Sequence, residues 1–345
     1  MITPDSQELV VALLHQAGIT QTVQSIQAIA NKGITNRMYL ITLQDKERFI
    51  LRHYQWPWAN REHLRLHKEQ FLHSLLRQAG VPVPAILADA QLAGQSAVLM
   101  EYVPGEELGD ITPALPEVAK AEAWHSCGQM LRRAHSISYP EGTSGVIVGT
   151  QVQPFAEFAG EAGSWGNEAL TWGHCQIRMI SDHFHQLIKR KPEIAMTGPQ
   201  LREILAESLP FLNRTPPTLL HNDTHPWNTL VRSDDDHWHC CAWLDWEYAW
   251  VGDPNWDLVR MDLFRRKPIG PTPEAFWEGY GRSPSEPERS VYEMHIFLWM
   301  ANQYLNGDRQ LLPTYEAAIS YVNQLDRVVK GIRRLLAESP RVKTR

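Results

Sequence analysis

The character of this sequence changes at Pro104–Gly105, and that change limits the folds open to the chain. Before it, short β-type runs dominate: we expect strands at 22–30, 38–43, 49–54 and 97–103, and helices at 6–17 and 60–79. After it, helical periodicity dominates, at 117–138, 174–191, 200–209 and 289–336, with short β stretches only within 218–257. These segments predict an α+β fold with a sheet-rich lobe, residues 1–103, and a mainly helical lobe, residues 104–345.

The composition excludes several classes of protein. With 345 residues, 43% of them hydrophobic, the chain can bury a sizeable core. A net charge of -6 argues against a nucleic-acid partner, which requires a basic surface. No apolar run reaches the roughly 18 residues of a membrane helix, so we expect no membrane partner. The four cysteines form no C-x-x-C pair and the N-terminus has no secretory pattern, which favours a reduced, cytoplasmic protein.

The densest group of reactive side chains lies within 218–257. It comprises HNDTHPWN at 221–228 and WLDWE at 243–247. Phosphoryl transfer requires a carboxylate that orients the attacking hydroxyl and accepts its proton, and oxygen ligands that hold magnesium on the nucleotide phosphates. Asp223 is the candidate base, and Asn228 and Asp245 are the candidate magnesium ligands.

The sheet-rich lobe offers the groups that a nucleotide phosphate needs. The turn GITN at 33–36, which contains Thr35 and Asn36, can present backbone N–H groups to phosphate. Arg52, on the next strand, is a cation that could reach phosphate oxygens. Glu69, beside the apolar stripe of the predicted helix, could hold Arg52 by a charge-assisted hydrogen bond. Ligands favour the space between two such lobes, so we expect the site there.

Taken in order, the motifs resemble the aminoglycoside phosphotransferase and choline kinase family, distant relatives of protein kinases. The motifs are GITN at 33–36, FILRHY at 49–54, Glu69 before GVPVP at 80–84, LMEYVPGE at 99–106, LRRAH at 131–135, LLHNDTHPWN at 219–228, LDWEYA at 244–249 and GDPNWDL at 252–258. They span nearly the whole chain. The resemblance therefore implies the two-lobed protein-kinase-like fold.

The resemblance also implies an activity. Asp223 would be the base, and Asn228 and Asp245 would hold Mg²⁺ on ATP or GTP. The acceptor would be a hydroxyl group of a small molecule: an aminoglycoside, an amino sugar, an amino alcohol or a related compound. The resemblance does not identify that acceptor.

A third implication concerns the adenine. The resemblance places it against the segment that joins the lobes, and we expect contacts from Met100, Glu101, Tyr102 and Val103. Two features depart from the pattern of kinases. Arg52 stands where many kinases have lysine, and the phosphate turn has one glycine, Gly33, in place of a glycine-rich loop.

Several of these residues also have purely structural interpretations. Asp223 could cap a helix, and His221 is expected to brace the loop through a hydrogen bond. Glu247 could assist with the metal or hold its own loop. Asp253 and Asp257 are expected to cap the helix that follows them.

Competing functions remain open at this level. A protein kinase is disfavoured because the segment from Asp245 to Asp257 is too short for an activation segment. A non-catalytic nucleotide-binding protein of the same fold is the main alternative. A metallohydrolase would use His221, Asp223 and His225. A zinc site is a weak further possibility, on three residues that share one face of a predicted strand: His237, His239 and Cys241.

Overall fold

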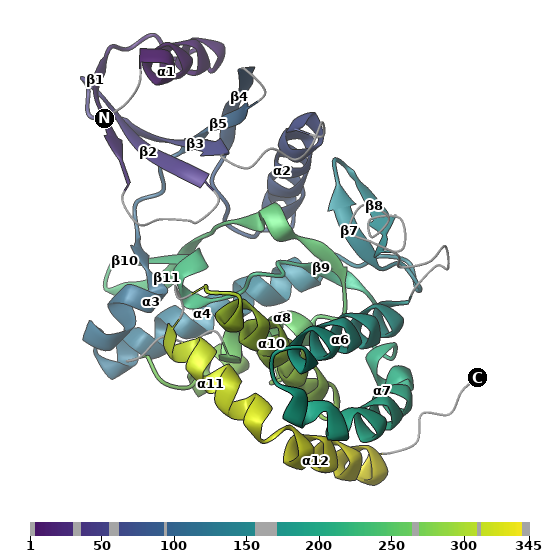
Figure 1. Ribbon diagram of the computed structural model, residues 1–345. Helices are drawn as coiled ribbons and strands as arrows, with labels where there is room; N and C mark the ends of the chain where they lie inside the picture. Colours follow the sequence, from purple (N-terminus) through teal and green to yellow (C-terminus); the bar gives the residue numbers. More distant parts are fainter. Residues whose placement is uncertain are drawn as a thin grey trace.

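The computed structural model describes residues 4–29, 36–54, 62–92, 95–155, 171–263, 269–308 and 312–339. A sheet-rich part stands at one end and a helix-rich part at the other (Figure 1). The two halves meet along the segment that follows β5 and along the loops around β9 to β12. No helix in these ranges is long and apolar enough to cross a membrane.

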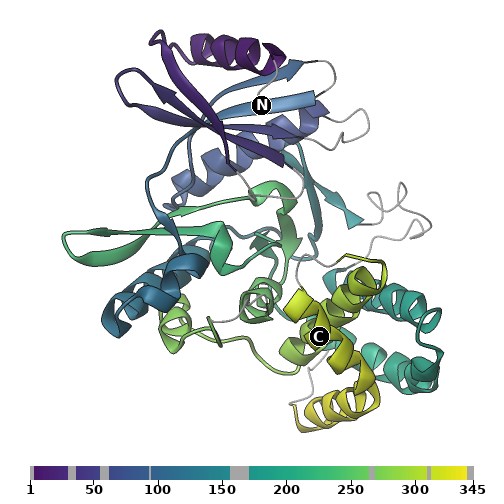
Figure 2. The ribbon, with the colours of Figure 1, turned by 60° about the vertical axis from the view of Figure 1, so that its left-hand side comes forward.

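The sheet-rich part is one antiparallel sheet with two helices. Its strand order is β1-β2-β3-β5-β4. The strands are β1 (Val23–Ala28), β2 (Asn36–Leu43), β3 (Arg48–Tyr54), β4 (Ile86–Leu92) and β5 (Gln95–Glu101). The helices are α1 (Pro4–Gln16) and α2 (Glu62–Gln78), both of which contact β4 and β5 (Figure 2).

The two faces of this sheet pack against different helices because side chains alternate along a strand. Phe49 and Leu51 of β3 belong to a core shared with α1, together with buried leucines of that helix. Ile50 and Tyr54, on the other face, pack with Leu66 of α2. Arg52 has the same parity as Ile50 and Tyr54, so the alternation turns its side chain toward α2.

A short segment connects the two parts. After β5 the chain continues to β6 (Glu106–Glu107), which pairs with β10 of the helix-rich part. Gly105 lies so close to that part that a Cβ atom there would be 2.7 Å from the Sγ of Cys241. Contacts this short essentially never occur for real Cβ atoms, so any larger residue would force the Cys241 side chain or the connecting segment to shift.

The part of the chain after β5 contains two small sheets. One has the order β11-β10-β6 and the other β8-β7-β12-β9. Their remaining strands are β7 (Gly145–Val148), β8 (Gln151–Pro154), β9 (Thr218–Leu220), β10 (Thr229–Asp234), β11 (His237–Trp243) and β12 (Trp250–Gly252). The helices α3 (Leu108–Ile111), α4 (Glu117–His135) and α9 (Glu274–Tyr280) lie beside them, with α4 packed on α9 and β11.

The far end of the molecule is a helical bundle. Its helices are α6 (Trp172–Ile188), α7 (Gly198–Leu212), α8 (Asn255–Leu263), α10 (Glu288–Leu305), α11 (Leu312–Asn323) and α12 (Leu325–Glu338). Helix α10 contacts α6, α8 and α11, and its buried face supplies much of the largest apolar core. Helix α8 therefore joins the bundle to the loops above it.

The observed elements confirm the predicted α+β fold, with an antiparallel sheet and a long helix followed by a largely helical region. Helix boundaries differ from prediction by a few residues. Strands β6, β7 and β8 were missed, since we expected β stretches in the helix-rich part only within 218–257, and in the sheet-rich part β4 was missed. Its sequence ILADAQL is short and contains two alanines and an aspartate, which are depleted in strands, and pairing along β5 outweighs that weak propensity.

Candidate active site

The loop after β9 carries the proposed base, and α8 holds its backbone. The carboxylate of Asp257 accepts hydrogen bonds from the backbone N–H groups of His221 (2.7 Å) and Asn222 (2.9 Å). His135 contacts the same carboxylate at 3.1 Å. Because Asp257 binds the loop in this way, the expectation that it caps α8 is wrong.

Asp253 behaves as expected for a residue that caps α8. One of its carboxylate oxygens accepts the backbone N–H of Asn255 at 2.9 Å, at the start of the helix. The other accepts the hydroxyl of Tyr292 at 2.7 Å, which ties the start of α8 to α10. Asp253, Asn255 and Tyr292 are all buried, so these hydrogen bonds fix the start of α8 under the loop after β9.

His221 braces the loop from inside, as predicted. Its Nδ1 accepts the backbone N–H of Asp223 at 3.2 Å, and its Nε2 lies 2.7 Å from the carbonyl oxygen of Leu244. Since Nδ1 accepts, Nε2 carries the proton and donates it to Leu244. Burial lowers the pKa of His221, which keeps the ring neutral in this role. The loop is thereby joined to the strand end next to Asp245.

The carboxylate of Asp223 is held on several sides. Its Oδ1 accepts a hydrogen bond from Arg260 at 2.9 Å. Its Oδ2 lies 3.4 Å from the Nδ2 of Asn228 and 3.7 Å from the Nε2 of His225. Burial raises the pKa of Asp223, but His225 and the charge of Arg260 outweigh burial and hold it well below its usual range. The side chain keeps 26% exposure, so a ligand can reach it.

Asn228 and Asp245 converge on neighbouring parts of the backbone. The carbonyl of Asn228 accepts the N–H of Leu244 at 2.8 Å, which sets the Asn228 side chain near the end of β11. The Nδ2 of Asn228 donates to the carbonyl of Asp223 at 2.9 Å, which turns its Oδ1 away from that bond. Asp245 has a left-handed backbone (φ 66°) and a side chain 25% exposed. One carboxylate and one amide oxygen are ligands that suit magnesium.

Arg52 links the sheet-rich part to this loop. Its guanidinium donates to Glu69 at 2.9 Å, which is the predicted contact, and to Asp245 at 2.6 Å, which the sequence did not predict. Burial acts to lower the pKa of Arg52, but the charges of Asp245 and Glu69 outweigh it and raise that pKa. Arg52 therefore connects α2 with the candidate metal ligand through one cation.

Two further contacts join the same parts. Asn36, the first residue of β2, donates through Nδ2 to the Oε1 of Glu247 at 3.1 Å. Lys68 of α2 donates to the carbonyl oxygens of Glu247 (2.7 Å) and Ala249 (3.2 Å). Burial and the nearby Asp245 raise the pKa of Glu247 to about 7. Lys68 was not predicted from the sequence, in which its position next to Glu69 is its one distinguishing feature.

The remaining nucleotide candidates lie at the edge of the sheet-rich part. Thr35 is outside the described residues. The Met100 side chain is buried on the α2 face, and the Glu101 N–H donates to the carbonyl of Ala85. Tyr102 is half-buried and stacks with Arg48 at 4.0 Å; Val103 is also half-buried. A contact of any of these residues with adenine stays a prediction.

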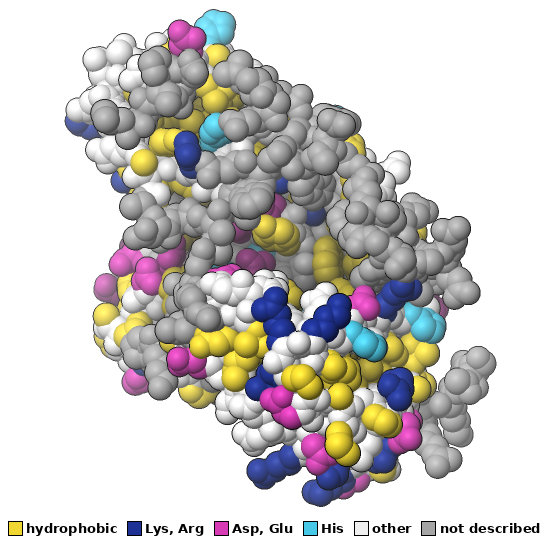
Figure 3. All heavy atoms as spheres, in the orientation of Figure 1, with side chains coloured by type: hydrophobic (Ala, Val, Ile, Leu, Met, Phe, Trp, Pro, Cys, Tyr) yellow, Lys and Arg dark blue, Asp and Glu magenta, His cyan; other side chains and the backbone are white. Residues whose placement is uncertain are grey.

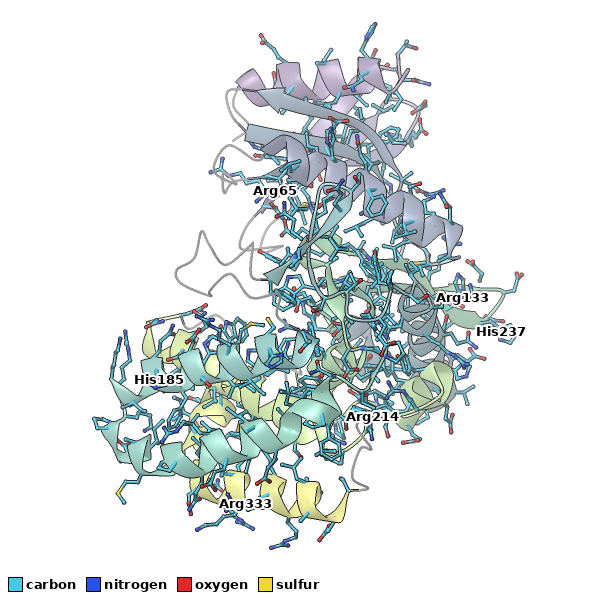
Figure 4. The ribbon with its side chains drawn as sticks, turned by 90° about the vertical axis from the view of Figure 1, so that its right-hand side faces the viewer. Arg65, Arg133, His185, Arg214, His237 and Arg333 are labelled. Carbon is cyan, nitrogen blue, oxygen red and sulfur yellow. The ribbon has the colours of Figure 1, made fainter. Side chains whose placement is uncertain are left out.

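A hollow lies between the two parts of the molecule, with acidic and hydrophobic side chains visible inside it (Figure 3). The residues considered for zinc lie elsewhere. His237 stands at the outer edge of the molecule, on β11, and contacts Glu122 at 3.1 Å (Figure 4). His239 contacts Asp234. In the ranges that the structure describes, no group of three or more His, Cys, Asp or Glu side chains could hold a metal ion.

Comparison with known proteins decides the family. Residues 25–293 match the model of the phosphotransferase enzyme family, APH. The chain belongs to this family. The match runs from β1 into α10 and so includes the loop of Asp223 and the strand end at Asp245. A search of curated proteins finds no match.

Solved structures share the fold of this phosphotransferase. APH(2″)-IIa in a ternary complex with streptomycin and ATP is 18% identical, with a TM-score of 0.58 over 94% of this chain and 97% of that one. APH(2″)-IIIa with GDP and kanamycin is 16% identical, with a TM-score of 0.62 over 92% and 98%. The macrolide 2′-phosphotransferase MphH from Brachybacterium faecium is 17% identical, with a TM-score of 0.54 over 92% and 98%. At these identities the likeness shows the two-lobed APH fold alone.

Proposed function

We propose that this phosphotransferase is a magnesium-dependent kinase that transfers the terminal phosphoryl group of ATP or GTP to a hydroxyl group of a small molecule. Family membership supports the reaction class. One geometric observation supports the assignment of residues. The Nδ2 of Asn228 donates to the backbone carbonyl of Asp223, and the backbone carbonyl of Asn228 accepts the N–H of Leu244, next to Asp245. The candidate base and both candidate metal ligands thus share one short network.

In this proposal Asp223 orients the acceptor hydroxyl and takes its proton. The hydroxyl oxygen attacks the terminal phosphorus, the bond to the bridging oxygen breaks, and the nucleoside diphosphate leaves. The low pKa of Asp223 keeps its carboxylate ionised. The carboxylate would therefore orient the acceptor hydroxyl and accept its proton late in the transfer. Asn228 and Asp245 would hold magnesium, which supplies positive charge against the phosphate oxygens.

The nucleotide would contact the residues predicted from the sheet-rich part. Arg52, held by Glu69, would face phosphate oxygens once the nucleotide enters. The turn with Thr35 and Asn36 would cover the phosphates, and Met100, Glu101, Tyr102 and Val103 would line the adenine. We also propose that the boundary between the two lobes lies between residues 103 and 104.

The acceptor belongs to the proposal as well. Solved relatives include complexes with streptomycin, kanamycin and gentamicin. We therefore expect an aminoglycoside, amino sugar or amino alcohol to serve as acceptor, in a reducing cytoplasmic setting that suits four free cysteines.

The test is an ADP- and GDP-release screen with magnesium over a panel of hydroxyl compounds. Aminoglycosides, amino alcohols, neutral sugars and hydroxy acids form its four arms. Turnover that requires both an acceptor and magnesium supports the proposal. Calorimetric nucleotide binding without turnover on any acceptor would instead identify a non-catalytic nucleotide-binding protein.

A further inference from the structure

The contact between Arg260 and Asp223 was not expected from the sequence. Arg260 lies on α8, and its side chain is 10% exposed. Its guanidinium donates to the Oδ1 of Asp223 at 2.9 Å. A cation placed on one oxygen of a carboxylate restricts the rotation of that group, because a charge-assisted hydrogen bond is shorter and stronger than a neutral one.

The guanidinium is itself held in place by aromatic rings. Its central carbon lies 5.7 Å from the ring centre of Trp256 on the same helix, and 5.9 Å from that of Trp299 on α10. Cation–π contacts at this range favour the charged group over the rings. Arg260 is therefore supported from two helices and needs no ligand to keep its position.

Helix α8 binds the loop after β9 through two residues on the same face of the helix. Asp257 binds the backbone N–H groups of His221 and Asn222, and Arg260, three residues later, binds the Asp223 side chain. Residues three apart lie on the same side of a helix. One rigid element thus sets both the path of the loop and the direction of its carboxylate.

The two oxygens of Asp223 have different surroundings as a result. Arg260 donates to Oδ1 at 2.9 Å, whereas Oδ2 accepts a longer hydrogen bond from Asn228 Nδ2 at 3.4 Å and lies 3.7 Å from His225 Nε2. We infer that Arg260 is a positioning residue that presents the Oδ2 of Asp223 to the acceptor hydroxyl. This inference rests on the proposed kinase function. The hydroxyl proton would pass to Oδ2, while Oδ1 remains bound to Arg260.

Two variants and a matched control test the inference. Arg260→Gln removes the charge and should lower kcat by about 10–100-fold, the loss expected when a reacting group shifts by about 1 Å. Nucleotide KM should stay within about twofold, since the contacts of Arg260 that carry this inference are to Asp223, Trp256 and Trp299 of the helix-rich part. Arg260→Lys keeps a cation and should recover part of kcat. The control is Arg289→Gln, because Arg289 binds Asp262 of the same helix at the same distance, 2.9 Å.

Crystal structures of the wild type and Arg260→Gln give a readout that does not depend on turnover. The Asp223 carboxylate should rotate in Arg260→Gln, while the loop backbone stays bound to Asp257. An unchanged carboxylate, or a kcat equal to that of Arg289→Gln, would overturn the inference. A wild type that turns over no acceptor would refute the proposed function, and the carboxylate position would still decide the role of Arg260.

Discussion

Lys68 offers a direct test of how the two parts of the molecule are joined. Its side chain is 2% exposed, and its ammonium group donates to the carbonyls of Glu247 and Ala249 in the loop after Asp245. Burial lowers the pKa of Lys68 to about 7, despite the opposing charges of Glu69 and Glu247. An ammonium group buried against carbonyl dipoles is therefore close to losing its proton at neutral pH.

The sign of the pH dependence follows from the two states. A lysine in the unfolded chain has a pKa of about 10.4, so between pH 7 and 10 the unfolded chain binds a proton that the folded chain has released. Stability rises with pH wherever the unfolded state binds more protons. For the two pKa values above, the contribution of Lys68 to the unfolding free energy should increase by about 2 kcal/mol from pH 7 to pH 9.

The measurement is urea unfolding of wild type and Lys68→Met at both pH values, followed by the fluorescence of the thirteen tryptophans. Lys68→Met removes the titrating group, so its advantage over wild type should shrink, or its deficit grow, by about 2 kcal/mol between pH 7 and 9. Lys330→Met, at a lysine whose side chain is 64% exposed, is the control and should run parallel to wild type. Parallel curves for Lys68→Met as well would refute the reasoning.

Three further predictions concern the candidate active site. Asp223→Ala should lower turnover by about 10²–10⁴ with little change in nucleotide affinity, and near-normal ADP release would remove Asp223 from the mechanism. Arg52→Ala should weaken nucleotide binding and destabilise the fold by about 3–5 kcal/mol, because it leaves the buried carboxylate of Glu69 without its guanidinium partner. Glu69→Ala should have the same effects more mildly, because Arg52 keeps its contact with Asp245. In the double variant the losses should fall short of their sum; additive losses would show that the pair is not coupled. Asp245→Asn should fold and bind nucleotide without the enhancement by magnesium seen in wild type, as calorimetry would show; full enhancement would exclude Asp245 as a ligand.

The sequence was most informative where a contact depends on local pattern. Alternation along β3 turns Arg52 toward α2, where helical spacing presents Glu69, so this pair could be predicted from two periodicities. His221 could be predicted for a similar reason, since a histidine at the start of a polar loop has backbone partners nearby. The two-lobed α+β fold followed from the change of pattern at Pro104–Gly105.

Contacts between distant segments could not be predicted in this way. Arg52 and Asp245 are 193 residues apart, and Asn36 and Glu247 are 211 apart, so no spacing rule relates them. Arg260 gave no signal either, because an arginine in a short helix is usually exposed to solvent. Asp257 was wrongly predicted to cap α8. An acidic residue in the first turn of a helix commonly caps it, and no local pattern shows that Asp257 binds the loop after β9 instead.

These distant contacts have a shared physical consequence. Arg52, Asn36 and Lys68 come from three different elements of the sheet-rich part, yet all bind the segment 245–249. Two of them bind side-chain carboxylates, and Lys68 binds backbone carbonyls. Ligand-induced movement of the sheet-rich part would therefore act on this segment, which the bond between Leu244 and His221 connects to the loop of Asp223. Helix α8 holds that loop separately, through Asp257 and Arg260, so the position of the proposed base is set by the helix-rich part while the proposed metal ligand Asp245 is shared between both.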